Sequence, residues 1–194
     1  MQQFKIKFSA IEIRHLLIAW LVISIAFSIA FGISIFVSMF TVGLGFIAHE
    51  LSHKAVAQRF KCFAEFRADF GMLLLAIIFA FMGFVFAAPG AVVILGRVRK
   101  DQYGKISLAG PLANIILALL FFFLALNPAS FLKTIAVYGF QINSWLALFN
   151  LIPFGPLDGR KILFWNKKIF ALVLITALLL VFGMPSLLSN LALG

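Results

Sequence analysis

The chain has 194 residues, of which 64% are hydrophobic and 11% are charged, and its formal net charge is +10. This composition excludes an ordinary soluble domain, which has a lower apolar and a higher charged fraction, and it indicates an integral membrane protein that crosses the bilayer several times. The Lys and Arg residues form short clusters between apolar runs. That distribution is typical of the positive-inside rule, and it favours anionic lipid over nucleic acid as the partner of the positive charge.

The N-terminal part of the chain predicts a surface strand followed by a membrane span. Apolar and polar residues alternate over 4–9, which predicts a short strand at the membrane surface. Residues 15–49 contain no Asp, Glu, Lys or Arg. At about 20 residues per span this stretch is too long for one helix. We divide it near 32–38 and expect the first span at 11–33. His15, at the start of that span, is interpreted as an interfacial histidine in preference to a metal ligand.

The second predicted span, at 40–60, contains the sequence HELSH. On a helix this H-E-x-x-H spacing puts His49 and His53 on one face, where two imidazoles can bind one Zn²⁺ ion. Glu50 lies slightly around the helix, in position to act as the general base of a metalloprotease. A chance match on a surface helix is the alternative, but the flanking apolar residues argue against it. The span ends at a basic cluster, so the motif is expected inside the bilayer, nearer the cytoplasmic face.

The apolar run at 70–95 has basic or polar residues at both ends, so a single crossing would break the positive-inside rule. A hairpin, a re-entrant segment or a broken helix fits better, and an ordinary kinked helix is the alternative. Pro89 and Gly90 mark the expected break, because proline lacks a backbone donor and glycine tolerates positive φ. Residues 92–95 are then expected to return as a strand that lines the active-site cavity. The predicted β elements thus lie near the N-terminus and at about 88–106.

Three further spans are predicted at 106–126, 131–152 and 168–182. The first of them carries Asn114, whose amide at membrane depth is expected to bond to a neighbouring helix. The predicted fold class is therefore an all-α polytopic membrane protein with about five to six transmembrane helices and small membrane-associated β elements. We expect one integral-membrane domain over 1–194, with its catalytic core at about 40–160.

The segment 150–160, NLIPFGPLDGR, breaks the helical pattern with two prolines and two glycines and contains Asp158. Catalytic zinc usually has three protein ligands and one water. The remaining acids, the single cysteine and the third histidine lie in basic or polar links, so Asp158 is the predicted third ligand. An ion pair with Arg160 or a helix-capping role is the alternative. Asn150, upstream on the same segment, can donate to the developing oxyanion of a peptide carbonyl.

Three stretches together resemble the site-2 protease family of intramembrane zinc metalloproteases: HELSH at 49–53, AGPLAN at 109–114 and NLIPFGPLDG at 150–159. They occur in the order typical of that family, and the likeness is to compact archaeal members without a PDZ or CBS domain. The resemblance implies that the two histidines of the motif and Asp158 bind one zinc ion and that Glu50 activates water. It also implies that Asn150 polarises the scissile carbonyl.

The resemblance further implies an enzyme of the cell membrane that hydrolyses peptide bonds within or near the transmembrane segments of other proteins. Its expected partners are such a segment and the lipid bilayer, with no role for nucleic acid; the sequence predicts no particular oligomeric state. A zinc transporter is one alternative, but it would be expected to carry several intramembrane carboxylates. A catalytically inactive scaffold is another, and the intact Glu50 argues against it.

Overall fold

The computed structural model describes residues 6–85, 89–126 and 130–185, and most of these residues are helical. Within these residues, three helices are long and apolar enough to cross a membrane: Ala10–Phe31, Ile35–Arg59 and Lys100–Ala125. The elements in chain order are α1 (Ala10–Phe31), α2 (Ile35–Ser38), the π-helix η1 (Met39–Gly43), α3 (Leu44–Arg59), β1 (Phe63–Ala68), α4 (Phe70–Ala80), β2 (Gly90–Leu95), α5 (Lys100–Ala125), α6 (Ser130–Asn150), α7 (Asp158–Trp165), α8 (Lys167–Leu178) and the π-helix η2 (Leu179–Gly183).

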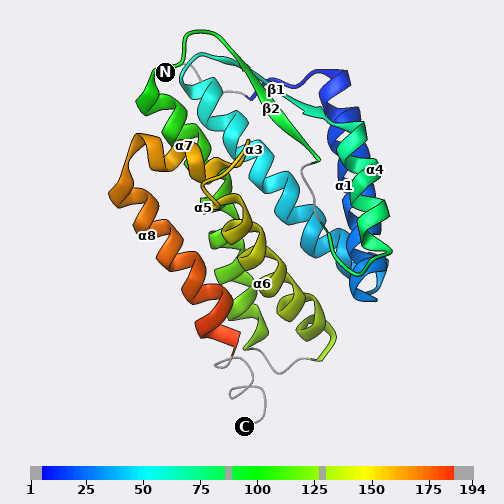
Figure 1. Ribbon diagram of the computed structural model, residues 1–194. Coiled ribbons are helices and arrows are strands. Elements are labelled where there is room, and N and C mark those ends of the chain that lie inside the picture. The colour runs from blue at the N-terminus through cyan, green and yellow to red at the C-terminus, as the bar shows by residue number, and fades with distance from the viewer. Residues whose placement is uncertain (1–5, 86–88, 127–129, 186–194) are drawn as a thin grey trace.

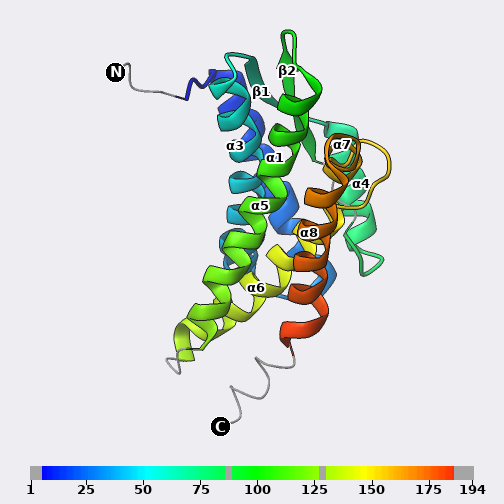
Figure 2. The same ribbon diagram turned by 90° about the vertical axis from the view of Figure 1, so that its left-hand side faces the viewer.

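The long helices lie side by side, and a two-stranded sheet and α7 lie together at one end of them (Figure 1). The second view agrees, with η2 at the opposite end (Figure 2). Helix α5 is central and packs against α3, α6 and α7, whereas α1 packs against α4, η1 and β1. The core that includes α5 and α6 contains four buried alanines: Ala118, Ala125, Ala136 and Ala147. Small side chains of this kind let helices approach closely.

The predicted division of the long uncharged stretch is confirmed. Helix α1 ends at Gly32, which has φ 63°, and helical structure resumes at Ile35. The second helical run contains the wider π turn η1, a feature that the sequence did not predict. The Met39 carbonyl within this turn accepts a hydrogen bond from Trp20 Nε1 at 3.1 Å. A side chain of α1 thus holds the beginning of the motif-bearing helix in place.

The predicted N-terminal strand at 4–9 is wrong for its described part, 6–9, which contains no strand. The Lys7 N–H donates to Gln58 Oε1 at 3.1 Å, and Gln58 Nε2 donates to the Lys7 carbonyl at 3.2 Å. A side chain of α3 therefore takes the place of a partner strand. Ser9 then caps α1, because its Oγ accepts from the Glu12 N–H at 3.1 Å. Residues 4 and 5 lie outside the described residues.

The sheet consists of β1 and β2 in antiparallel register, from Phe63 opposite Leu95 to Ala68 opposite Gly90. The predicted return strand is confirmed as β2, whereas β1 lies in a segment interpreted as a polar link. The predicted β element at 88–106 is wrong beyond Leu95, since α5 already begins at Lys100. Helix formation starts early there because the Arg99 N–H donates to the Gln102 side chain at 3.0 Å, which caps the first turn.

In the run at 70–95 the chain leaves the sheet, forms helix α4 and returns to the sheet as β2. Helix α4 has 11 residues, and at 1.5 Å per residue it is only about half as long as the hydrocarbon layer is thick. The Asp69 N–H donates to the Pro89 carbonyl at 2.9 Å, so the chain comes back to where it left the sheet. The described residues agree with the predicted hairpin, but the break lies earlier than predicted, because α4 ends at Ala80 and not near Pro89.

Helices occupy the other predicted segments, whereas the short helix α7 was not predicted. Helix α5 covers the span expected at 106–126, α6 covers 130–150, and α8 continues into η2 over 167–183. The turns between α6 and α7 occupy 151–157, where the prolines and glycines predicted a break. This break reverses the chain, so that α7 packs against α5 at the same end as the sheet.

Candidate metal centre

Helix α3 and the first residue of α7 bring three potential ligands together. His49 Nε2 lies 3.3 Å and His53 Nε2 lies 3.1 Å from Asp158 Oδ2. All three side chains are buried, and their ligand atoms lie within 4.8 Å of one another. Within the described residues this is the one group of three or more His, Cys, Asp or Glu side chains with such spacing. The structure therefore places the three predicted ligands within reach of a single ion.

The outer nitrogen of each imidazole has a hydrogen-bond partner. His49 Nδ1 lies 2.6 Å from Asn114 Oδ1, and His53 Nδ1 lies 2.7 Å from the Ile106 carbonyl oxygen. Both oxygens can only accept, so each Nδ1 carries the proton and donates it. Each Nε2 then keeps a lone pair directed toward Asp158, which is the tautomer that a metal ligand needs. Two imidazole nitrogens and one carboxylate oxygen form a donor set that fits Zn²⁺.

A buried amide pair continues this arrangement away from the imidazoles. Asn114 Nδ2 donates to the Gly45 carbonyl and to Asn143 Oδ1, both at 3.1 Å. Asn143 Nδ2 in turn donates to the Gly139 carbonyl at 2.9 Å. The prediction that Asn114 bonds to a neighbouring helix is confirmed. Asn143 was missed, although an asparagine in the middle of the apolar run of α6 carried the same signal.

Gly110 makes room for the two imidazoles. A Cβ atom at this position would collide with His53 Nε2 and would lie 2.6 Å from His49 Nε2. Any side chain on α5 would therefore occupy the space in which the ligand nitrogens converge. The glycine of the AGPLAN stretch is thus explained by the close approach of α5 to α3.

Asp158 reaches the histidines because the turns at 151–157 are tight. Gly155 has φ 58°, a conformation that favours glycine. A Cβ at Gly159 would collide with the Leu151 carbonyl, so the start of α7 packs directly on the end of α6. The second carboxylate oxygen, Asp158 Oδ1, lies 3.3 Å from Lys161 Nζ. The observed ion pair is thus with Lys161 and not with Arg160, the partner considered from the sequence, and it leaves Oδ2 facing the imidazoles.

A cavity of about 150 Å³ borders the three ligands. Glu50 and Asn150 both line it, as do Val92 and Ile94 of β2. Glu50 is 8% exposed. Asn150 Nδ2 donates to the Leu146 carbonyl of its own helix at 2.9 Å. The predicted base, the predicted oxyanion donor and the return strand thus share one cavity with the ligands.

The third histidine lies elsewhere. His15 Nδ1 accepts a hydrogen bond from the Ala68 N–H at 3.2 Å, and its ring packs edge-on against Phe70. It holds the end of β1 to α1 and is not part of the ligand group. Its interpretation as a residue other than a ligand agrees with this position.

Known proteins similar to this chain are named as zinc metalloproteases. "Putative zinc metalloprotease MJ0611" of Methanocaldococcus jannaschii is 45% identical over 173 residues, which cover 86% of this chain and 91% of the relative. "Zinc metalloprotease MJ0392" of the same organism is 30% identical, over 82% of this chain and 43% of the relative. "Putative zinc metalloprotease YwhC" of Bacillus subtilis is 31% identical, over 63% of this chain and 65% of the relative. No protein-family model matches the chain, and no solved structure matches it.

Proposed function

This chain belongs to the family of zinc metalloproteases, and we propose that it is an intramembrane member of the site-2 protease type. Its cofactor is zinc. The proposed reaction is hydrolysis of peptide bonds within or near the transmembrane segments of other proteins. The observation that carries the proposal is the His-His-Asp cluster, which includes two residues of a helix apolar and long enough to cross a membrane.

The positions of five polar residues around the cavity support a role for each of them. His49, His53 and Asp158 would hold the zinc ion, which when bound would lower the pKa of water toward neutrality and polarise a carbonyl group. Glu50 takes a proton from the attacking water and delivers it to the leaving amine. Asn150 exchanges its intrahelical bond to Leu146 for one to the scissile carbonyl oxygen, on which negative charge develops.

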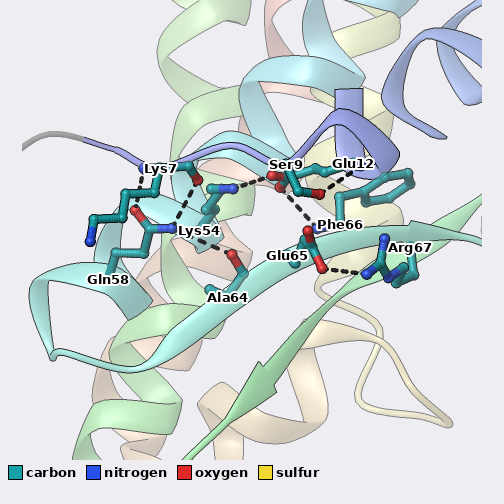
Figure 3. Close-up of polar contacts among 9 residues, drawn as sticks. All are labelled: Lys7, Ser9, Glu12, Lys54, Gln58, Ala64, Glu65, Phe66 and Arg67. Carbon is teal, nitrogen blue, oxygen red and sulfur yellow. Dashed lines mark hydrogen bonds and ion pairs between the residues drawn. The ribbon is translucent and has the colours of Figure 1, made fainter. Parts of the chain in front are cut away.

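The sheet supports a binding mode for the substrate. Helix side chains cover the edge of β1 that faces away from β2 in three places. Gln58 Nε2 donates to the Ala64 carbonyl (3.4 Å), and Glu12 Oε1 accepts from the Phe66 N–H (3.0 Å; Figure 3). His15 Nδ1 accepts from the Ala68 N–H (3.2 Å). Because backbone groups alternate in direction along a strand, the groups of Val92 and Ile94 on β2 point away from β1. Both residues line the cavity.

We infer that an unwound substrate segment pairs with the open edge of β2. A helix within the membrane has all its backbone groups bonded and must be extended before its carbonyl can be attacked. Strand addition supplies new partners to those groups and fixes the segment beside the ligands. The proposed partner is therefore a single membrane segment in extended form, together with the surrounding bilayer.

The positions of the basic residues support an orientation. Basic residues occur at the C-terminal end of α3 and at the N-terminal ends of α5 and α8, and these ends lie toward the same end of the helices as the sheet (Figures 1 and 2). The positive-inside rule assigns that end to the cytoplasm. His53 precedes Arg59 by about 9 Å of helix. We therefore propose a multi-pass protein of the cell membrane, with five to six spans and its active site nearer the cytoplasmic side.

The proposed domain organisation is one membrane-embedded unit over 1–194 with its catalytic core at about 40–160.

Metal content and cleavage test the assigned roles together. We expect the wild type, purified in detergent, to contain one zinc ion per chain and to cleave a generic transmembrane substrate. Glu50→Gln is expected to retain zinc and lose cleavage, whereas Asp158→Ala is expected to lose both. Asp101→Asn, which removes an exposed carboxylate at the start of α5, is the matched control and should retain both. Full cleavage by Glu50→Gln would refute the proposed reaction.

A further inference from the structure

Lys54 follows Glu50 by one helical turn on α3. A glutamate four residues before a lysine is the favoured arrangement for an ion pair on a helix. The structure has a different pair: Lys54 Nζ binds Glu12 Oε2 of α1 (Figure 3). Glu12 and Lys54 are 0% and 1% exposed, so this pair is enclosed by protein. Glu12 was grouped with the acids of the polar links in the sequence, and its burial was not predicted.

Contacts from β1 and from the two residues before α1 surround the Glu12–Lys54 pair. The Glu12 Oε1 atom accepts the Phe66 N–H of β1 at 3.0 Å, and the Glu12 N–H donates to Ser9 Oγ at 3.1 Å. The Lys54 ammonium also lies over the ring of Phe8, 4.3 Å from its centroid. A cation over an aromatic face is attracted to it, more strongly when water is excluded. The lysine is therefore held on the side of α3 that faces α1 and β1.

Glu50 and the Glu12–Lys54 pair thus have separate surroundings. Glu50 lines the cavity beside the metal ligands, whereas Lys54 does not contribute to the described lining. A Lys54 side chain turned toward Glu50 would place an ammonium group on the carboxylate that accepts the proton. Glu65, the other buried carboxylate near the sheet, is paired with Arg67. Glu12 is accordingly the carboxylate that forms the ion pair with Lys54.

We propose that Glu12 is a positioning residue that binds Lys54 outside the cavity and so keeps the Glu50 carboxylate free to act as the base. The inference rests on the proposed function, because it concerns the availability of Glu50. A buried ammonium without a counter-charge is strongly unfavourable. Once Glu12 loses its charge, Glu50 becomes the carboxylate one turn away with which Lys54 pairs.

Two single variants and their combination test this role. Glu12→Gln keeps an oxygen acceptor for Phe66 but removes the charge that binds Lys54. We expect its kcat to fall about 100-fold, within the range of a general-base contribution, with KM and zinc content unchanged. Lys54→Met keeps the bulk of the lysine and removes the competing ammonium, so we expect kcat near that of the wild type and a lower Tm. The double variant should regain the kcat that Glu12→Gln has lost.

The asymmetry between the single variants separates this role from a purely structural one. If the pair served only to stabilise the fold, Glu12→Gln and Lys54→Met would lower Tm and activity together. Glu65→Gln is the matched control, because it removes a buried carboxylate of the neighbouring strand β1 and leaves Lys54 paired with Glu12. Wild-type kcat in Glu12→Gln, or a double variant as slow as Glu12→Gln, would overturn the proposal.

A second measurement does not depend on activity. An apolar carbodiimide joins a lysine amine to an adjacent carboxylate as an amide, and mass spectrometry identifies the joined peptides. We expect a Glu12–Lys54 amide in the wild type and a Glu50–Lys54 amide in Glu12→Gln. Absence of the second product contradicts the role of Glu12 even if the protein cleaves no substrate. A wild type with the expected amide and without zinc-dependent cleavage would instead contradict the proposed function alone.

Discussion

The Nδ1 atom of His49 and the Oδ1 atom of Asn114 lie 2.6 Å apart, so α3 and α5 are joined through the ring of a candidate metal ligand. The side-chain nitrogen of the same residue, Asn114 Nδ2, donates hydrogen bonds to the Gly45 carbonyl and to Asn143 Oδ1. Its oxygen is therefore directed at the imidazole by the surrounding fold and needs no rearrangement when the metal binds. Such outer partners fix the orientation of the ligand and raise its basicity.

Asn114→Ala is expected to weaken zinc binding 10- to 100-fold, the range typical of lost outer partners. The imidazole of His49 loses its acceptor, and a buried N–H is left without a partner. The measurement is competition for zinc with a chelator of known affinity. Asn166→Ala is the control, since Asn166 caps α8 away from the site. Equal zinc affinity in the two variants would contradict the role of Asn114.

Gly110→Ala is expected to abolish zinc binding and cleavage, because the added Cβ would collide with His53 Nε2. The helix itself should remain, since alanine favours helix more than glycine does. Zinc content and circular dichroism measure the two effects separately. Gly71→Ala on α4 is the control: its nearest neighbour would be Asp69 Oδ1 at 3.3 Å, and we expect zinc to stay bound. A zinc-loaded Gly110→Ala protein would show that the approach of α5 is not as close as described.

Asn150→Ala is expected to lower kcat by about 100- to 1,000-fold, the usual effect of removing an oxyanion donor. Zinc content should not change, because Asn150 is not among the ligand group. Single-turnover cleavage under zinc saturation measures the chemical step. An unchanged kcat would remove Asn150 from the proposed machinery and leave the ligands unaffected.

Val92→Pro is expected to raise KM for transmembrane substrates at least tenfold, because proline removes the N–H that β2 offers to an added strand. Val92→Ala keeps this N–H while it trims the side chain, so it serves as the matched variant and should change KM much less. Steady-state cleavage at several substrate concentrations gives both values. Equal KM for the two variants would indicate that side-chain contact, and not strand addition, holds the substrate.

Local patterns were enough to predict which three side chains the fold brings together at the candidate metal centre. The spacing of His49 and His53 depends only on helix geometry, and Asp158 was the acid associated with a proline- and glycine-rich break. The partners that orient these ligands were harder to predict. The Ile106 carbonyl has no signal in the sequence, because every residue has a carbonyl and only the fold selects one.

The missed features depend on contacts between distant segments. β1 alternates charged and apolar residues in a short stretch between a helix and an apolar run, and its pairing with β2 requires the chain to return after α4. Glu12 reads as an interfacial acid beside Arg14, yet it is buried because Lys54 and the Phe66 N–H meet it from other elements. The position of an acidic residue near a predicted span boundary was therefore not enough to predict whether its carboxylate contacts water or protein.

The covering of β1 by Gln58, Glu12 and His15 gives the described sheet a one-sided character. A ribbon that can grow in one direction only cannot be extended into a continuous stack of neighbouring copies. The other edge, that of β2, lines the cavity beside the candidate ligands. A segment that pairs with this sheet would therefore do so next to His49, His53 and Asp158.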